Sequence, residues 1–210
     1  METVILAVRH GETEWNLVGR MQGHSDSPLT ATGVRQARLL AEGLAGKRVD
    51  ILYSSDLGRA LRTAEIIAGR LSLDIQVDPR LRERQLGVME GLTRQEFAAR
   101  FPQDAAQFNS GDPDYAVPGG ESARQRHGRC VACAEDLARR HAGKRLLLVG
   151  HGGTLCSFFY KATNTALTEP RRFSVLNASV SSFRVDGGQW LLDTWGETAH
   201  LDALRALDDN

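Results

Sequence analysis

An unbroken apolar run from Val4 to Val8 stops at Arg9-His10-Gly11, and this junction limits the possible folds more than any other feature of the chain. A run without polar alternation is typical of a strand that is buried on both faces, as in a parallel sheet covered by helices on each side. Such a strand delivers Arg9 and His10 into the turn that follows it. A buried strand that ends in charged residues indicates a functional site at its end.

The same pattern occurs twice more in the chain. Residues 145–150 form a second, largely apolar strand that leads into His151, and residues 49–53 form a third that leads into a polar turn ending at Arg59. In open parallel sheets, ligands bind where the loops leave the carboxyl ends of the strands. We therefore expect His10, Arg59 and His151 to converge on one pocket.

Strands and helices alternate through residue 161, which predicts an α/β fold with three layers, α/β/α, around a mainly parallel central sheet. Two β-rich runs at 179–185 and 189–195 predict a closing hairpin, whose outer strand could leave a sheet edge that pairs in a homodimer. A short strand is expected at 73–77, and Ser55 or Asp56 is expected to cap the helix after the third run. Further helices are expected at 29–45, 57–71, 93–101, 103–109, 121–141, after residue 151 and at 196–207.

Length and composition suit one domain over residues 1–210, with 41% hydrophobic residues to fill its core. Lysine plus arginine equals aspartate plus glutamate at 26 each, so the charge balance indicates neither nucleic acid nor an anionic membrane as a partner. No apolar run is long enough to span a membrane, and the first residues lack the basic start of a signal peptide. We expect a soluble, cytoplasmic protein.

The chain has an odd number of cysteines, Cys130, Cys133 and Cys156, and its first residues lack the features of a signal peptide. We therefore do not expect a framework of disulfide bonds. Cys130 and Cys133 have the Cys-x-x-Cys spacing of redox and zinc sites, but they fall within a predicted helix and have no second pair. We interpret them as core residues.

Short motifs beyond these junctions form an ordered set from about residue 4 to about residue 160. They are Arg9-His10-Gly11-Glu12-Thr13, Asn16, Gly19-Arg20, Gln22-Gly23, Asp26, Pro28-Leu29-Thr30, Gly33, Ser54-Ser55-Asp56-Leu57-Gly58-Arg59-Ala60, Glu83, Gly87, Glu90-Gly91, Gly119-Gly120-Glu121-Ser122 and Gly150-His151-Gly152. In order and spacing this set resembles the histidine phosphatase superfamily, which includes the cofactor-dependent phosphoglycerate mutases. The resemblance implies a phosphoglycerate mutase-like fold.

The resemblance also implies roles for individual residues. His10 would be the residue that is phosphorylated, Glu83 the acid and base, and Arg9, Arg59 and His151 the phosphate ligands. Substrate-binding residues would be Asn16, Arg20, Gln22, Gly23, Arg94 and Gly152. Neither a metal ion nor a cofactor is implied, and the expected partner is a small phosphorylated metabolite.

Phosphoryl transfer suits these residue types on chemical grounds. Its transition state spreads negative charge over equatorial oxygens, and positioned cations such as Arg9 and Arg59 stabilise that charge. A neutral imidazole at His10 is a competent nucleophile, and a phosphohistidine would split the displacement into two easier steps. Glu83 with a raised pKa could protonate the leaving alkoxide and later activate water.

Two alternatives from other classes remain open. A metal-dependent hydrolase could use His10 and His151 with nearby carboxylates, but two arginines would repel the metal and the chain has no His-Glu-x-x-His pair. A non-catalytic module could keep the pocket to sense a phosphorylated metabolite.

Within the family, a mutase is the alternative to a phosphatase. A mutase needs extra cations over its pocket, whereas the expected cover segment, residues 84–122, has neither lysine nor arginine from 101 onwards. Gly153 also stands where mutases tend to have Asn. We therefore expect hydrolysis, and the acidic character of the cover argues against a substrate with a second phosphate. Phosphoserine, a sugar phosphate or α-ribazole phosphate would be compatible.

Overall fold

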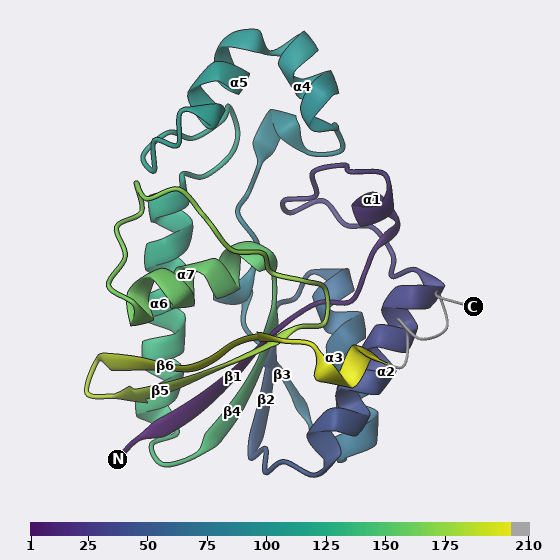
Figure 1. Ribbon diagram of the computed structural model, residues 1–210, viewed down its shortest axis with the longest axis vertical. Coiled ribbons are helices and arrows are strands. Elements are labelled where there is room, and N and C mark those ends of the chain that lie inside the picture. The colour runs from purple at the N-terminus through teal and green to yellow at the C-terminus, as the bar shows by residue number, and fades with distance from the viewer. Residues whose placement is uncertain (203–210) are drawn as a thin grey trace.

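Six strands form one sheet in the computed structural model, which describes residues 1–202 (Figure 1). The strands follow the order β3-β2-β4-β1-β5-β6; the first four are parallel to one another, and β5 is antiparallel to both β1 and β6. Their bounds are β1 (Thr3–Arg9), β2 (Ile51–Ser54), β3 (Ile75–Val77), β4 (Arg145–Gly150), β5 (Val180–Asp186) and β6 (Gln189–Glu197). The predicted α/β architecture with a mainly parallel sheet is confirmed.

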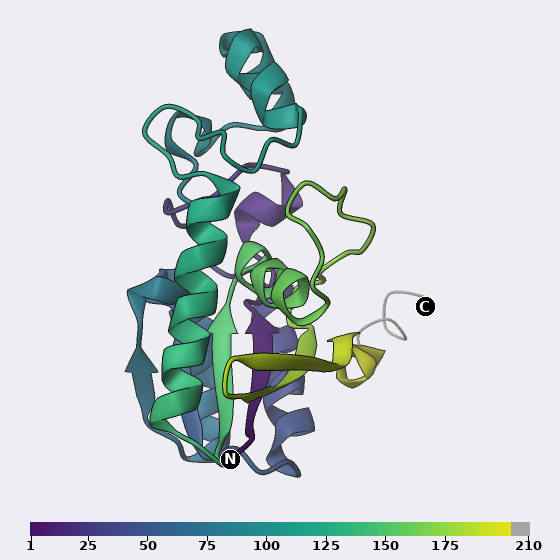
Figure 2. The same cartoon turned by 90° about the vertical axis from the view of Figure 1, so that its left-hand side faces the viewer.

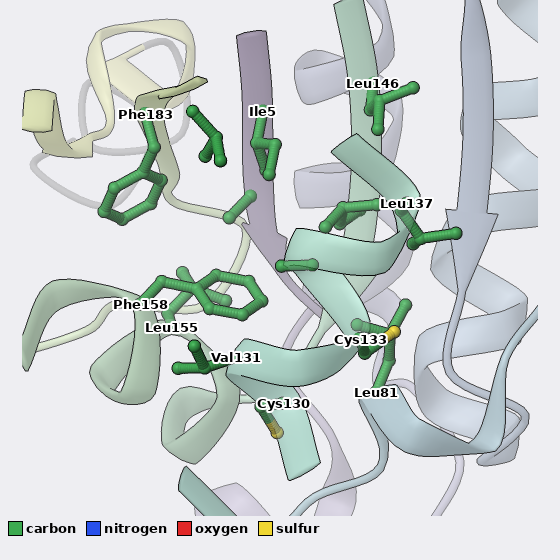
Figure 3. Close-up of a cluster of buried hydrophobic side chains, with 14 of the residues drawn as sticks. Ile5, Leu81, Cys130, Val131, Cys133, Leu137, Leu146, Leu155, Phe158 and Phe183 are labelled. Atoms are coloured by element: carbon green, nitrogen blue, oxygen red, sulfur yellow. The ribbon is translucent and has the colours of Figure 1, made fainter. Parts of the chain in front are cut away.

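Both faces of the central strands are buried, which explains the apolar runs of the sequence. In β1, Ile5 and Ala7 pack into one apolar cluster, and Leu6 and Val8 pack into a second cluster on the opposite face. Successive side chains of a strand point to opposite faces, so a strand covered on both sides needs apolar residues at every position. Figure 3 shows Ile5 in the first cluster, among side chains from the helices of that face.

Helices cover both faces of the sheet (Figures 1 and 2). α2 (Ala31–Ala45) and α3 (Gly58–Leu71) contribute to the second cluster, and α6 (Ala123–Arg140) and α7 (Gly152–Ala162) contribute to the first. The shorter helices are α1 (Glu14–Leu17), α4 (Arg94–Arg100), α5 (Pro102–Asn109), and the 3₁₀ turns η1 (Pro79–Leu81), η2 (Gly87–Met89) and η3 (Ala199–Leu201). Within residues 1–202, no helix is long and apolar enough to cross a membrane.

The predicted hairpin is formed by β5 and β6. Gly187 and Gly188 connect the strands with positive φ angles of 55° and 83°. Two consecutive residues with positive φ are what a two-residue hairpin turn requires, and glycine adopts them without strain.

The cover segment, residues 84–122, contains η2, α4 and α5 and lies beyond the loop that holds α1 (Figures 1 and 2). Its own apolar cluster consists of Leu86, Met89, Phe97, Ala105 and Val117. Backbone bonds tie the segment to the loop after α1: the Met21 N–H donates to Leu92 O at 2.9 Å, and the Gly91 N–H donates to Met21 O at 2.8 Å. The cover is therefore fixed by a loop that also contributes to the site described below.

Three expectations on local structure need correction. The strand expected at 73–77 begins only at Ile75, because the Leu73 N–H still donates to Ala68 O at the end of α3. The N-cap of α3 is Leu57, which gives no side-chain cap, rather than Ser55 or Asp56. Of the helix expected at 196–207, the first two residues belong to β6, residues 199–201 form η3 and Asp202 is helical, whereas residues 203–210 lie outside the described residues.

Cys130 and Cys133 are buried in the first apolar cluster and are free thiols (Figure 3). Burial raises the pKa of Cys130 to about 11 and that of Cys133 to about 12. Reactive and metal-binding cysteines have lowered pKa values. The interpretation as core residues is confirmed.

Candidate active site

The carboxyl ends of β1, β2 and β4 lie side by side, since Arg9 pairs with Gly150 and Ser54 pairs with Val149. A cavity of about 370 Å³ opens beside this edge of the sheet. Ten of the eleven predicted site residues line it: Arg9, His10, Asn16, Arg20, Gln22, Gly23, Arg59, Glu83, Arg94 and Gly152. The eleventh, His151, is fully buried next to His10, with ring centroids 5.3 Å apart.

His10 is held so that one ring nitrogen stays free. Its Nδ1 lies 2.7 Å from the carbonyl oxygen of Gly11. A carbonyl oxygen only accepts hydrogen bonds, so Nδ1 carries the proton and Nε2 is the unprotonated nitrogen. Burial, together with the charges of Arg9 and Arg59, lowers the pKa of His10 well below its usual value. The imidazole is therefore neutral at neutral pH, as a nucleophile must be.

The backbone of His10 is fixed by a residue that the sequence did not single out. Asn177 donates from Nδ2 to His10 O at 3.1 Å and to Asn16 Oδ1 at 3.2 Å. The Thr13 N–H also donates to Asn16 Oδ1, at 3.1 Å, so the amide N–H₂ of Asn16 is the group that this side chain can offer to a ligand. Asn177 thus links two residues of the cavity wall.

His151 lies behind His10 and is also neutral. Its Nε2 is 2.9 Å from Ser55 Oγ. Burial lowers the pKa of His151 well below its usual value, and the charges of Arg59, His10 and Arg9 act in the same direction. A bound anion would oppose this effect, because negative charge nearby stabilises the imidazolium form.

Arg59 is 2% exposed and is clamped by three oxygens. It donates from Nη1 to Asp26 Oδ1 and Ser25 O, both at 2.9 Å, and from Nη2 to Gly23 O at 2.8 Å. The backbone N–H of Arg59 also donates to Asp26 Oδ1 at 3.3 Å. The Asp26 carboxylate therefore occupies the N-terminus of α3.

Three buried nitrogens of the predicted phosphate ligands have no hydrogen-bond partner within residues 1–202: Arg9 Nε, Arg59 Nε and His151 Nδ1. Arg9 is otherwise fixed by donating to Val175 O. Buried polar groups without partners are rare in proteins and call for an explanation such as a bound ion. Arg9 and Arg59 line the cavity, so their unpartnered N–H groups suit an anion that accepts several hydrogen bonds.

Glu83 also lines the cavity, and its charge acts on Arg9 and Arg59. Its Oε2 accepts from the Gly153 N–H and its Oε1 from the Arg84 N–H, each at 2.8 Å. Burial raises the pKa of this carboxyl, but the charge of Arg126, the two backbone N–H groups and the charge of Arg59 outweigh burial and lower the pKa. The expected raised pKa is therefore wrong for the ligand-free protein, since the sequence did not reveal that Arg126 of α6 faces Glu83.

Two glycines at the cavity are required by close approaches. A Cβ at Gly153 would lie 2.0 Å from Glu83 Oε1. A Cβ at Gly23, where φ is 56°, would lie 2.2 Å from Glu90 Oε1. Glu90 also accepts from the His24 N–H at 2.9 Å, so it shapes the loop that presents Gly23 O to Arg59.

Arginines that the sequence analysis missed also line the cavity: Arg84, Arg126 and Arg171. Counted with those predicted, seven arginines and one carboxylate of the described residues face this space. Arg84 could have been suspected from its position beside Glu83, whereas Arg126 and Arg171 carry no motif and are brought in by the fold. The cover does lack lysine and arginine from residue 101 onwards, but arginines of other segments supply cations to the site.

The acidic residues of the cover segment do not face the cavity. Asp104 accepts from the Tyr115 hydroxyl at 2.6 Å, and Asp114 pairs with Arg124 at 2.6 Å. Glu121 pairs with Arg129 on α6. These carboxylates are bonded inside the cover or at its base, so the argument against a second phosphate on the substrate no longer holds.

A metal site would need several His, Cys, Asp or Glu side chains close together. Within the described part of the chain, no three His, Cys, Asp or Glu side chains gather in a way that could hold a metal ion. The two histidines of the site face arginines instead.

Comparison with known proteins gives a family match, two similar relatives and a similar solved structure. The family model for the histidine phosphatase superfamily (branch 1) matches residues 5–198. Phosphoglycerate mutase-like protein 4 of Arabidopsis thaliana is 39% identical over 202 residues, covering 94% of this chain and 86% of the relative. A metal-independent phosphoserine phosphatase of the same plant is 36% identical over 208 residues, covering 98% and 86%. The solved structure of Bacillus stearothermophilus YhfR matches with a TM-score of 0.89 and 34% identity, over 95% of this chain and 99% of that one.

Proposed function

We propose, since the chain belongs to the histidine phosphatase superfamily (branch 1), that it hydrolyses small phosphomonoesters without a metal ion, through a phosphohistidine at His10. One observation carries this proposal. The imidazole of His10 keeps its proton on Nδ1, which leaves Nε2 as a free nucleophile in a cavity that Arg9, Arg59 and Glu83 also line.

The reaction would proceed in two displacements. In the first, His10 Nε2 attacks phosphorus, the bond from phosphorus to the substrate oxygen breaks, and protonated Glu83 gives its proton to that oxygen. In the second, Glu83 takes a proton from water, the water oxygen attacks phosphorus, and the phosphorus–nitrogen bond breaks. Arg9 and Arg59 stabilise the charge on the equatorial oxygens in both steps.

Substrate binding would supply the proton state that Glu83 needs for the first step. The lowered pKa makes the carboxylate the dominant form of the ligand-free protein at neutral pH. A phosphate bound at Arg9 and Arg59 compensates charges that lower this pKa, so the pKa rises when substrate binds. We expect kcat/KM to increase as the pH falls, as in acid phosphatases.

Asn16, Gln22, Gly23 and Gly152 would complete the phosphate end of the cavity, and Arg20 and Arg94 would lie nearer the leaving group. We treat residues 1–210 as one unit, with residues 84–122 as its cover. A cavity of about 370 Å³ is at the lower end of the range for small-molecule sites, which suits a metabolite of few atoms. The relative named as a phosphoserine phosphatase supports a substrate of this size.

A cofactor-dependent phosphoglycerate mutase is the second candidate, and the seven arginines of the cavity favour it more than the sequence did. A mutase must retain a doubly phosphorylated intermediate, and cations assist that retention.

One incubation separates these candidates. The protein is mixed with 3-phosphoglycerate in EDTA, with and without 2,3-bisphosphoglycerate, and both inorganic phosphate and 2-phosphoglycerate are measured. Phosphate release in EDTA supports the proposal. Formation of 2-phosphoglycerate that depends on the bisphosphate, without phosphate release, would identify a mutase, and activity lost in EDTA would favour a metal-dependent hydrolase.

The non-catalytic alternative is tested with His10→Ala. We expect this variant to release no phosphate and to form no acid-labile phosphoprotein, while wild-type protein does both. A phosphate-sensing module would instead bind its ligand without turnover in either form.

A further inference from the structure

Two key residues of the cavity come from different segments of the chain. Arg59, a predicted phosphate ligand, is on α3, whereas Glu83, the proposed acid and base, lies between η1 and η2. A general acid must lie within hydrogen-bond reach of the oxygen that it protonates, and a displacement of about 1 Å can cost about 100-fold in rate. A contact that fixes Glu83 relative to Arg59 would therefore act on the reaction.

The loop of residues 23–26 makes such a contact. Two of its carbonyl oxygens and the carboxylate of Asp26 accept from the guanidinium of Arg59 at 2.8 to 2.9 Å. From the same loop, His24 Nε2 lies 2.9 Å from the carbonyl oxygen of Glu83. A carbonyl oxygen only accepts hydrogen bonds, so Nε2 donates. One short loop therefore bonds both residues.

The backbone of His24 is itself anchored. Its N–H donates to Glu90 Oε1 at 2.9 Å, and the following N–H, that of Ser25, donates to Glu90 Oε2 at 2.8 Å. Hydrogen bonds to a charged carboxylate are stronger than those between neutral groups. His24 is also half-buried. An anchored ring of this kind can set the position of Glu83 relative to the loop, which a fully solvated ring could not.

The need to satisfy a backbone carbonyl does not explain the contact. Arg129 on α6 also donates to Glu83 O, from Nη2 at 3.2 Å, and its Nη1 donates to two further carbonyl oxygens of the same segment. The carbonyl of Glu83 would therefore keep a partner without His24. What His24 adds is the connection to the loop that holds Arg59.

We propose that His24 is a positioning residue, which holds Glu83 at the correct distance from a phosphate bound at Arg59 by donating from Nε2 to the Glu83 carbonyl oxygen. Within residues 1–202, the lining of the cavity does not include His24, so it acts through Glu83 rather than on the substrate. This inference rests on the proposed function, because it takes Glu83 as the group that protonates the leaving oxygen.

Two variants of the full chain separate this bond from other effects of His24. His24→Gln keeps an amide N–H close to the position of Nε2, whereas the shorter side chain of His24→Asn cannot reach the carbonyl oxygen of Glu83. Each protein is assayed in EDTA at one pH with glycerol 3-phosphate, whose leaving alkoxide needs a proton, and with p-nitrophenyl phosphate, whose leaving group does not. The value of kcat/KM for each ester reports the first displacement.

We expect His24→Asn to lower kcat/KM for glycerol 3-phosphate at least about tenfold, because general acid catalysis contributes about 10²–10⁴-fold. For p-nitrophenyl phosphate the change should stay within about twofold, and His24→Gln should keep kcat/KM for glycerol 3-phosphate within about threefold of wild type. Calorimetry should give an affinity for inorganic phosphate within about twofold of wild type in both variants, because Arg9 and Arg59 are unchanged.

A purely structural role of His24 gives a different result. If His24→Asn lowered kcat/KM equally for both esters, or weakened phosphate binding, the inference would be wrong. It would also be wrong if His24→Asn affected neither ester, or if His24→Gln lost as much activity toward glycerol 3-phosphate as His24→Asn. Wild-type protein that releases no phosphate from either ester in EDTA contradicts the proposed function, and the inference with it. An unselective loss in a variant of an active wild type contradicts the inference alone.

Discussion

Replacing Arg126 should move the proton equilibrium of Glu83 without disturbing the nucleophile. The Cβ position of Gly153 lies 2.0 Å from Glu83 Oε1 and 2.7 Å from Arg126 Nη1, which limits the distance between these two atoms to at most about 4.7 Å. At an effective dielectric constant of about 20, opposite unit charges at this distance attract by roughly 3.5 kcal/mol. Arg126 is half-buried and solvent screens part of this attraction, so we expect Arg126→Gln to raise the pKa of Glu83 by about 1–2 units.

The shift has a definite sign in the kinetics. Glu83 must be protonated to assist departure of an alkoxide, so kcat/KM falls as the pH rises through the pKa of Glu83 in the free enzyme. A higher pKa moves this fall to higher pH. Other charges near Glu83, those of Arg59 and Arg84, remain in the variant and keep the change partial.

The assay compares two leaving groups over about pH 4–9. Glycerol 3-phosphate needs a proton on its leaving oxygen, whereas p-nitrophenyl phosphate does not. In Arg126→Gln, the alkaline fall should move by about 1–2 pH units for the alkyl ester and stay in place for the aryl ester. Arg124→Gln, on the same helix but paired with Asp114, is the matched control. An unchanged alkyl profile in Arg126→Gln would refute the assignment of Glu83 as the acid controlled by Arg126.

Three further predictions concern the groups that position the site. Gly153→Ala should lower kcat about 100-fold in steady-state assays, because its Cβ displaces Glu83, and a change of less than threefold would contradict the close approach. Asn177→Ala should lower the free energy of unfolding in urea by about 1–2 kcal/mol through the two lost bonds, and kcat should fall with it; unchanged values for both would show that Asn177 does not position the site. Because burial and the neighbouring arginines lower the pKa values of His10 and His151, the unfolded chain binds protons first, and stability is lost as the pH falls below about 6.5. Between pH 6.5 and 5.5 each imidazole contributes up to about 1.4 kcal/mol to this loss. The free energy of unfolding of His10→Asn, measured by urea denaturation, should therefore depend less steeply on pH than that of the wild type. Equal pH dependence in the two proteins would contradict this prediction.

The apolar runs of the sequence were sufficient to predict the three central strands of the sheet and the loops that follow their carboxyl ends. Ile5 and Leu6 pack on opposite faces of β1, so the lack of alternation in that strand had a direct structural meaning. The family motifs located ten residues that line the cavity and the buried His151. Local capping was predicted less well, because Ser55 contacts His151 rather than capping α3.

The sequence could not predict the electrostatic balance of the site. Whether a charged residue acts on the site depends on its partners in space, and these come from distant segments. Asp114 is neutralised by Arg124, and Glu121 by Arg129, so an acidic cover leaves the cavity without added negative charge. Arg126 lies far from Glu83 in the chain, yet its positive charge opposes the effect of burial and helps to lower the pKa of Glu83.

By itself, then, the sequence determined which backbone is buried and where each strand ends, because hydrophobic periodicity and motif spacing are properties of neighbouring residues. Only the tertiary structure decided that Arg84, Arg126 and Arg171 also reach the cavity, and that Glu83 is ionised there. The physical reason is that Coulomb interactions and desolvation depend on distances through space, which the fold sets and the order of residues does not state.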